Sequence, residues 1–129
     1  MNDDEPEAVE ARLSALRGLQ PGWLDGQNGW PPSWEVIDWL RRVLQARYPS
    51  QLDQPWLFPT PEGGIQAEWC FGFSEVTLDI QPQAVTGTLH ALDLTTDSDD
   101  AEIIRLDTDE AWDALFCRLK QLMFAACNE

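Results

Sequence analysis

A carboxylate and the only imidazole in the chain could form an acid–base pair on neighbouring strands. If the turn between two alternating stretches centres at Pro82-Gln83, Glu75 lies opposite His90. A carboxylate in that position raises the pKa of an imidazole, and the two groups are the minimum for general acid–base catalysis. A general base also needs a pocket, whereas the pattern predicts an open sheet face. We therefore expect ordinary surface pairing here, no catalytic residue and no enzymatic activity.

Acidic residues are concentrated late in the chain, where they could bind a cation. Residues 93–113 contain nine acids against Arg105 alone. Aligned as a calcium loop that begins at Asp97, the chain has Glu102 where the loop requires glycine and Thr108 where it requires a bidentate glutamate. We predict a solvated acidic loop and no metal site, with a weak, nonspecific cation site as the alternative. The exposed carboxylates of this loop are expected to be Asp97, Asp99 and Asp100.

No other stretch has the pattern of a cofactor or nucleophile site. The sequence contains no GxxxxGK[ST], GxGxxG or GxSxG pattern and no cysteine–histidine cluster at zinc-ligand spacing. Cys70, Cys117 and Cys127 have no CxxC spacing, and we expect reduced, partly buried thiols. No cofactor is predicted.

The net charge restricts the classes of partner. Twenty-three acids and eight bases give a formal net charge of −15. Duplex nucleic acids and anionic membrane surfaces both attract basic proteins, so direct binding to either is disfavoured. The first ten residues carry five acids and no base, which does not fit a signal or transit peptide. No apolar run approaches the roughly 18 residues of a membrane span, and we predict a cytoplasmic protein.

Seven tryptophans in 129 residues could serve a core or a binding surface. Trp69 and Trp112 lie on apolar faces of their elements, which predicts core positions. Trp23 and Trp30 lie in a segment rich in glycine and proline that can bury little of itself. They either hold this segment in place or contact a partner, since tryptophan is enriched at interface hot spots.

Three segments have helical periodicity. The first two are residues 4–17 and 33–47, and Ser33 after two prolines is the expected N-cap of the second helix. The third follows Asp107 and Glu110, whose spacing matches a capping box and predicts the start of a C-terminal helix.

From about residue 56 to residue 106 the apolar residues alternate, which predicts antiparallel strands with one apolar and one polar face. The polar face carries Glu68, Glu75 and Asp79. The predicted fold is α+β: two N-terminal helices, an antiparallel meander of three to five strands, and a C-terminal helix packed on one sheet face. Residues 1–129 are expected to form a single domain.

Two motifs resemble the signature of a family of small bacterial proteins. They are GWLDGQNGWPPS, residues 22–33, and LFPTPEGGIQAEW, residues 57–69. Strands similar to EVTLDI and HALDL, and a terminal helix opened by an acidic cap and a tryptophan, extend the resemblance from about residue 12 over most of the chain. The family is functionally unassigned, so the resemblance implies a bacterial or phage origin and a stand-alone small domain, and it assigns no catalytic role.

These features favour a non-catalytic module, monomeric or dimeric, that restrains or assembles with a basic protein such as a toxin or a nucleic-acid-binding protein. Antitoxins, immunity proteins and inhibitors that mimic nucleic acid are of this type. The alternatives are an acidic chaperone or adaptor for a secreted or phage protein, and a small-ligand binder or unfamiliar enzyme with its pocket under residues 22–34. The expected partner-binding residues are Trp23, Asp25, Trp30, Glu68, Glu75, Asp79, Asp97, Asp99 and Asp100.

Overall fold

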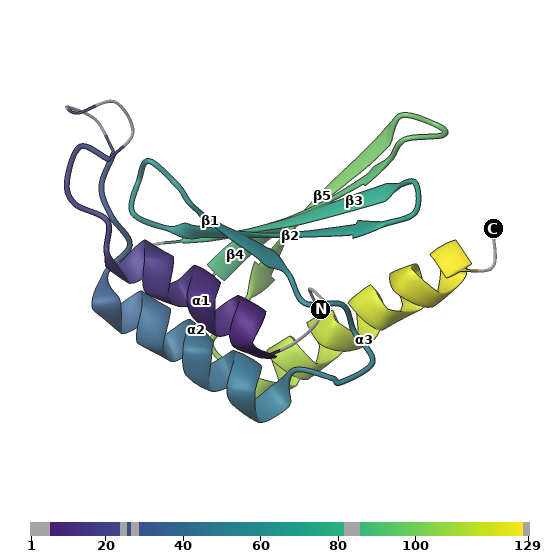
Figure 1. Ribbon diagram of the computed structural model, residues 1–129. Helices are drawn as coiled ribbons and strands as arrows, with labels where there is room; N and C mark the ends of the chain where they lie inside the picture. Colours follow the sequence, from purple (N-terminus) through teal and green to yellow (C-terminus); the bar gives the residue numbers. More distant parts are fainter. Residues whose placement is uncertain (1–5, 24–25, 27–28, 82–85, 128–129) are drawn as a thin grey trace.

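Three helices lie on one side of a five-stranded antiparallel sheet (Figure 1). The computed structural model describes residues 6–23, 26, 29–81 and 86–127. The elements are α1 (Pro6–Arg17), α2 (Trp34–Arg47), β1 (Trp56–Pro59), β2 (Ile65–Phe71), β3 (Ser74–Ile80), β4 (Thr86–Asp93), β5 (Ser98–Arg105) and α3 (Asp109–Cys127). The predicted α+β fold, with two N-terminal helices, a meander and a C-terminal helix on one sheet face, is confirmed.

The strands follow one another across the sheet in the order in which they occur in the chain. Alternation decides which side chains are buried: in β2, for example, Ile65, Ala67, Trp69 and Phe71 are buried beneath the helices. The predicted register between β3 and β4 is wrong by two residues, because Glu75 lies opposite Leu92 and His90 lies opposite Thr77. The Gln81 N–H donates to the Thr86 carbonyl, and the connection between β3 and β4 has five residues, 81–85, which is longer than the predicted turn.

An aromatic cluster joins the helices to the sheet. Trp112 of α3 packs edge-on against Trp39 of α2, with ring centroids 5.5 Å apart, and its indole N–H donates to the Leu106 carbonyl at 3.0 Å. Trp69 of β2 donates to the Tyr48 hydroxyl at 2.9 Å. The exposed fraction of Trp69 is 3% and that of Trp112 is 2%, so both predicted core positions are confirmed.

The two helix caps differ in how well the sequence predicted them. The Ser33 hydroxyl accepts the Val36 N–H at 3.1 Å, which confirms Ser33 as the N-cap of α2. The capping box at Asp107 and Glu110 is wrong: Thr108 is the N-cap of α3, and its hydroxyl accepts the Ala111 N–H at 3.1 Å. Asp107 instead accepts hydrogen bonds from Arg105, which lowers the pKa of its carboxyl.

Gly64 occupies a position without room for a side chain, and its replacement tests the β1–β2 connection. A Cβ at Gly64 would lie 2.3 Å from the Ile80 carbonyl oxygen of β3. Gly64→Ala is therefore expected to lower the free energy of unfolding, measured by urea denaturation, by about 1–3 kcal/mol. Gly18→Ala is the control, because its Cβ would come no closer than 3.7 Å to the Ala15 carbonyl. Equal stability of the two variants would contradict the close approach of Gly64 to the backbone of Ile80.

Candidate functional site

The side of the sheet opposite the helices carries a polar surface, which we call the free face. Residues directly opposite each other on adjacent strands share a face. The strand register therefore gives the residues of the free face row by row across the sheet. One row consists of Trp56, Glu68, Thr77, His90 and Ala101. Neighbouring rows add Phe58, Gln66, Cys70, Glu75, Asp79, Thr86, Thr88, Leu92, Asp99, Ile103 and Arg105.

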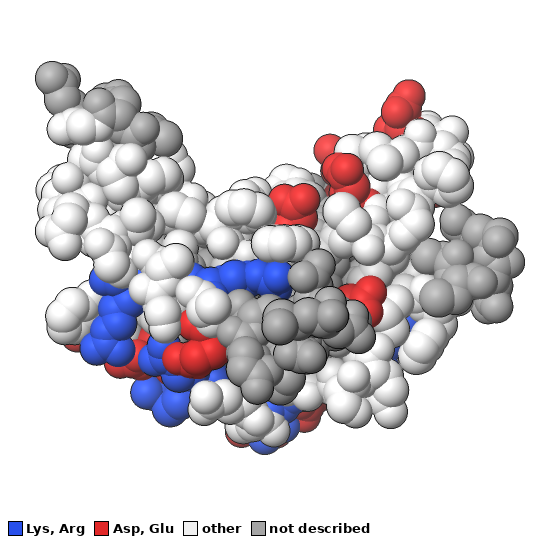
Figure 2. Space-filling view, viewed as in Figure 1, with Lys and Arg blue, Asp and Glu red and all other residues white. Residues whose placement is uncertain are grey.

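Four carboxylates lie together on the free face. The sequence placed Glu68, Glu75 and Asp79 on one face, and the register confirms this; Asp99 of β5 joins them because it lies opposite Leu92. Viewed from the side, the molecule is hollowed between the segment that precedes α2 and the β-hairpins, and acidic side chains gather on the hairpin wall (Figure 2). The free face therefore combines a concave shape with negative charge.

The predicted acidic loop is wrong in two respects. β5 begins at Ser98, so Asp99 and Asp100 belong to a strand and only Asp97 lies in the β4–β5 turn, where its φ is +56°. Because neighbours along a strand point to opposite faces, Asp100, which pairs with Ala91, lies on the helix side. Asp97, Asp99 and Asp100 therefore do not form one surface.

Basic residues are almost confined to the helices. Of the eight Lys and Arg residues, all of which lie in the described part of the chain, seven belong to α1, α2 and α3. The exception is Arg105 at the end of β5, and Asp107 holds its guanidinium at 2.5 Å. Among the described residues, no ion pair forms at Glu68, Glu75 or Asp99.

Cys70 responds to the charge of the free face. Partial burial raises the pKa of its thiol, and the carboxylates of Glu68 and Glu75 raise it further because they disfavour a thiolate beside them. As whole residues, Cys70 and Cys117 are both exposed, more than predicted, although neighbouring atoms partly shield the Cys70 thiol from water. The side chain of Cys127 lies outside the described part of the structure. The raised pKa makes Cys70 a poor nucleophile.

Two aromatic residues that the sequence analysis did not assign to the site lie beside the carboxylates. Trp56 and Phe58 of β1 are exposed on the free face, and the guanidinium carbon of Arg12 lies 3.9 Å from the Trp56 ring centroid. The signal for both was present in the sequence, because they alternate with the buried Leu57. The free face thus has an aromatic edge at β1.

The loop tryptophans take different roles. The Trp23 indole N–H donates to the Trp30 carbonyl at 2.9 Å, so Trp23 holds the loop in place. The Trp30 N–H donates to the Pro61 carbonyl, which fixes the loop to the β1–β2 connection, while the Trp30 side chain is 67% exposed. Asp25 lies outside the described residues.

The histidine has no enclosed site for acid–base chemistry. His90 Nε2 lies 3.8 Å from Asp79 Oδ2, and both side chains are substantially exposed on the free face. Glu75, the predicted partner, lies one row away, opposite Leu92. An exposed pair of this kind does not exclude water from a bound substrate.

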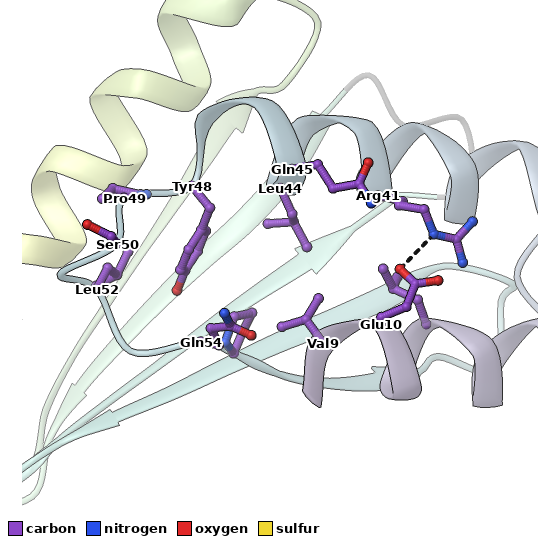
Figure 3. A pocket seen from close by; sticks show the side chains of 12 residues that line it. Val9, Glu10, Arg41, Leu44, Gln45, Tyr48, Pro49, Ser50, Leu52 and Gln54 are labelled. Atoms are coloured by element: carbon purple, nitrogen blue, oxygen red, sulfur yellow. Dashed lines mark hydrogen bonds and ion pairs between the residues drawn. The ribbon is translucent and has the colours of Figure 1, made fainter. Parts of the chain in front are cut away.

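A pocket of about 730 Å³ lies between α1, α2 and residues 48–55 (Figure 3). Its walls are mainly apolar, and the ion pair between Glu10 and Arg41, 3.0 Å apart, lies at one end. The small-ligand alternative placed a pocket under residues 22–34, but none of those residues lines this one. Gln54, also at the pocket, has a buried Oε1 atom without a hydrogen-bond partner.

No group of histidine, cysteine and acidic side chains among the described residues is arranged to hold a metal ion. In the same part of the chain, no helix has both the length and the apolar character needed to cross a membrane. No protein-family model, curated protein or solved structure matches the chain.

The reactivity of Cys70 is expected to report the potential of the free face. Glu68→Gln with Glu75→Gln removes the two carboxylates that raise the pKa of the thiol, so more thiolate forms and Cys70 reacts with iodoacetamide a few-fold faster at about pH 7.5. Mass spectrometry of the separate peptides measures the rate at each cysteine. Cys117 on α3 is the internal control and should be unchanged; an equal acceleration at Cys117 would contradict a local effect.

The unpartnered Gln54 oxygen is expected to reduce stability. Gln54→Met keeps the length of the side chain and removes Oε1, so the free energy of unfolding should rise by about 1 kcal/mol in urea denaturation. Gln45→Met is the control, because Gln45 borders the same pocket but is exposed. A loss of stability in Gln54→Met alone would mean that Oε1 makes a hydrogen bond in solution.

Proposed function

We propose that this protein is a cytoplasmic, non-catalytic module that binds a basic protein partner through the free face. The observation that carries the proposal is the separation of charge: Glu68, Glu75, Asp79 and Asp99 share a face, while seven of the eight basic residues lie on the helices. Complementary charge accelerates association and selects for a cationic surface.

The aromatic edge supplies a second kind of contact. Trp56 and Phe58 flank the carboxylates, and Trp30 is exposed at the nearby β1–β2 connection. Aromatic side chains bury large areas at low entropic cost and are enriched among residues that dominate binding energy. Acids then govern the rate of association and its salt dependence, and the aromatic residues govern how long a complex lasts.

Inhibition of a folded basic protein accounts for this surface better than the alternatives. A sheet face suits an antitoxin, an immunity protein or an inhibitor that mimics nucleic acid, because the strands hold the backbone positions of its carboxylates relative to one another before binding. A chaperone for an extended client would use an apolar groove, and the groove between α1 and α2 lies away from the carboxylates. An enzyme would need a base in an enclosed pocket, whereas His90 is on an open face.

Neutralising two carboxylates of the free face is expected to weaken partner binding. The tagged protein is incubated with an extract of the cells that encode it, and captured proteins are identified by mass spectrometry after washing at about 0.05 M and about 0.5 M salt. Wild type should retain a cationic protein at low salt, and Glu68→Gln with Glu75→Gln should retain on the order of tenfold less.

The matched control is Glu35→Gln with Glu110→Gln. It changes the net charge by the same amount, on exposed first-turn residues of α2 and α3. We expect this variant to capture the partner as wild type does. If both pairs of substitutions reduce capture equally, overall charge and not the free face is responsible, and the proposal fails.

A further inference from the structure

Strand β5 forms an open edge of the sheet. It pairs with β4 on one side, and no described strand lies on its other side. Seven of its eight residues are exposed, and the β4–β5 hairpin projects beyond the helical layer (Figure 1). An edge of this kind presents backbone N–H and carbonyl groups with which a further strand can pair.

Two hydrogen bonds identify which backbone groups of β4 point toward β3. The Gln81 N–H donates to the Thr86 carbonyl, and the Leu94 N–H donates to the Phe73 carbonyl. In an antiparallel ladder, alternate residues direct both backbone groups to the same neighbour. Even-numbered residues of β4 therefore bond to β3, and odd-numbered residues bond to β5.

The same alternation identifies the open groups of β5. The odd-numbered residues of β4 lie opposite Ser98, Asp100, Glu102 and Ile104. Those residues direct their backbone groups to β4, so Asp99, Ala101 and Ile103 direct theirs outward at the open edge. The side chains of these three residues lie on the free face, because they are opposite Leu92, His90 and Thr88. A strand added at this edge would extend the free face.

The charge of β5 selects the occupant. Asp99 and Asp100 have no ion-pair partner among the described residues, and Glu102 has only Arg118 of α3, at 2.6 Å. A second copy of the chain paired along this edge would bring its own acids against these, which costs free energy. A strand with lysine or arginine opposite the acids would pair with favourable electrostatic free energy. An apolar residue of that strand would cover Ile103, which is 78% exposed.

We propose that β5 pairs with an extended, basic segment at the surface of the folded partner, and that this segment becomes a sixth strand of the sheet. The proposal rests on the proposed function and names its mode of binding: backbone hydrogen bonds at Asp99, Ala101 and Ile103 fix the segment, and the acids of β5 select its charge. The added strand places its own side chains beside the carboxylates of the free face.

The test uses the full chain and a defined peptide of eight residues in which lysine and valine alternate. Binding is measured at low salt by fluorescence of a labelled peptide, and amide hydrogen exchange is measured residue by residue. We expect the N–H groups of Asp99, Ala101 and Ile103 to become protected in the complex. The N–H groups of Asp100 and Glu102, which already bond to β4, should not change.

Two substitutions at one residue test backbone pairing while the charge of β5 stays the same. Ala101→Pro removes an outward N–H without removing a bond to β4, and should weaken peptide binding at least about tenfold. Ala101→Val keeps the N–H and should bind as wild type does. The stability of each variant is measured by thermal unfolding, and exchange in the wild-type chain gives a result that does not depend on either variant folding.

Three outcomes would overturn the proposal: no binding of the peptide, binding without protection at the three N–H groups, or equal binding by a peptide in which glutamate replaces lysine. Binding that protects no amide of β5 but is lost in Glu68→Gln with Glu75→Gln would overturn edge pairing and leave the proposed function standing. The proposed function would itself be overturned if the protein captured its partner equally well with and without those two substitutions.

Discussion

The fold depends on burying one face of the sheet against an aromatic cluster. Trp39, Tyr48, Trp69, Trp112 and Phe116 lie where α2, α3 and β2 meet, with the Tyr48 and Phe116 rings 5.1 Å apart. Large rings can be buried here because their polar groups are satisfied inside: the Trp112 N–H donates to the Leu106 carbonyl and the Trp69 N–H to the Tyr48 hydroxyl. All three helices are held to one side, and the other side of the sheet stays uncovered.

That division makes the free face independent of the core. A residue on the helix side must fit its neighbours, and Gly87 shows how little space a position can leave, because a Cβ there would lie 3.0 Å from side-chain atoms of Leu78 and Leu106. A residue on the free face has to satisfy only the strand geometry. Acids, threonines and exposed aromatic residues can therefore collect there without loss of packing, while the arginines of the helices take up the ion pairs that hold those helices together, such as Arg47 with Asp113.

The sequence predicted faces better than it predicted pairings. Alternation placed Glu68, Glu75 and Asp79 together correctly although the β3–β4 register was wrong, because a shift of two residues keeps every side chain on its own face. The same shift changes which residues lie opposite each other, so the predicted pairing of Glu75 with His90 was wrong. The register depended on the length of the connection after Gln81, and the sequence contains no strong turn dipeptide there that would fix it.

Acids lie on the helices as well as on the sheet, and four of them share the free face. A net charge of −15 keeps a tryptophan-rich chain dispersed wherever the acids lie, and an even distribution would minimise repulsion between them. Here Glu68 and Glu75 lie close enough to raise the pKa of Cys70 between them, and among the described residues no ion pair relieves the charge of either carboxylate. Holding like charges together on one face costs folding free energy. In the proposed complex, a cationic partner surface would remove this cost, and the open edge of β5 lies beside the same charges.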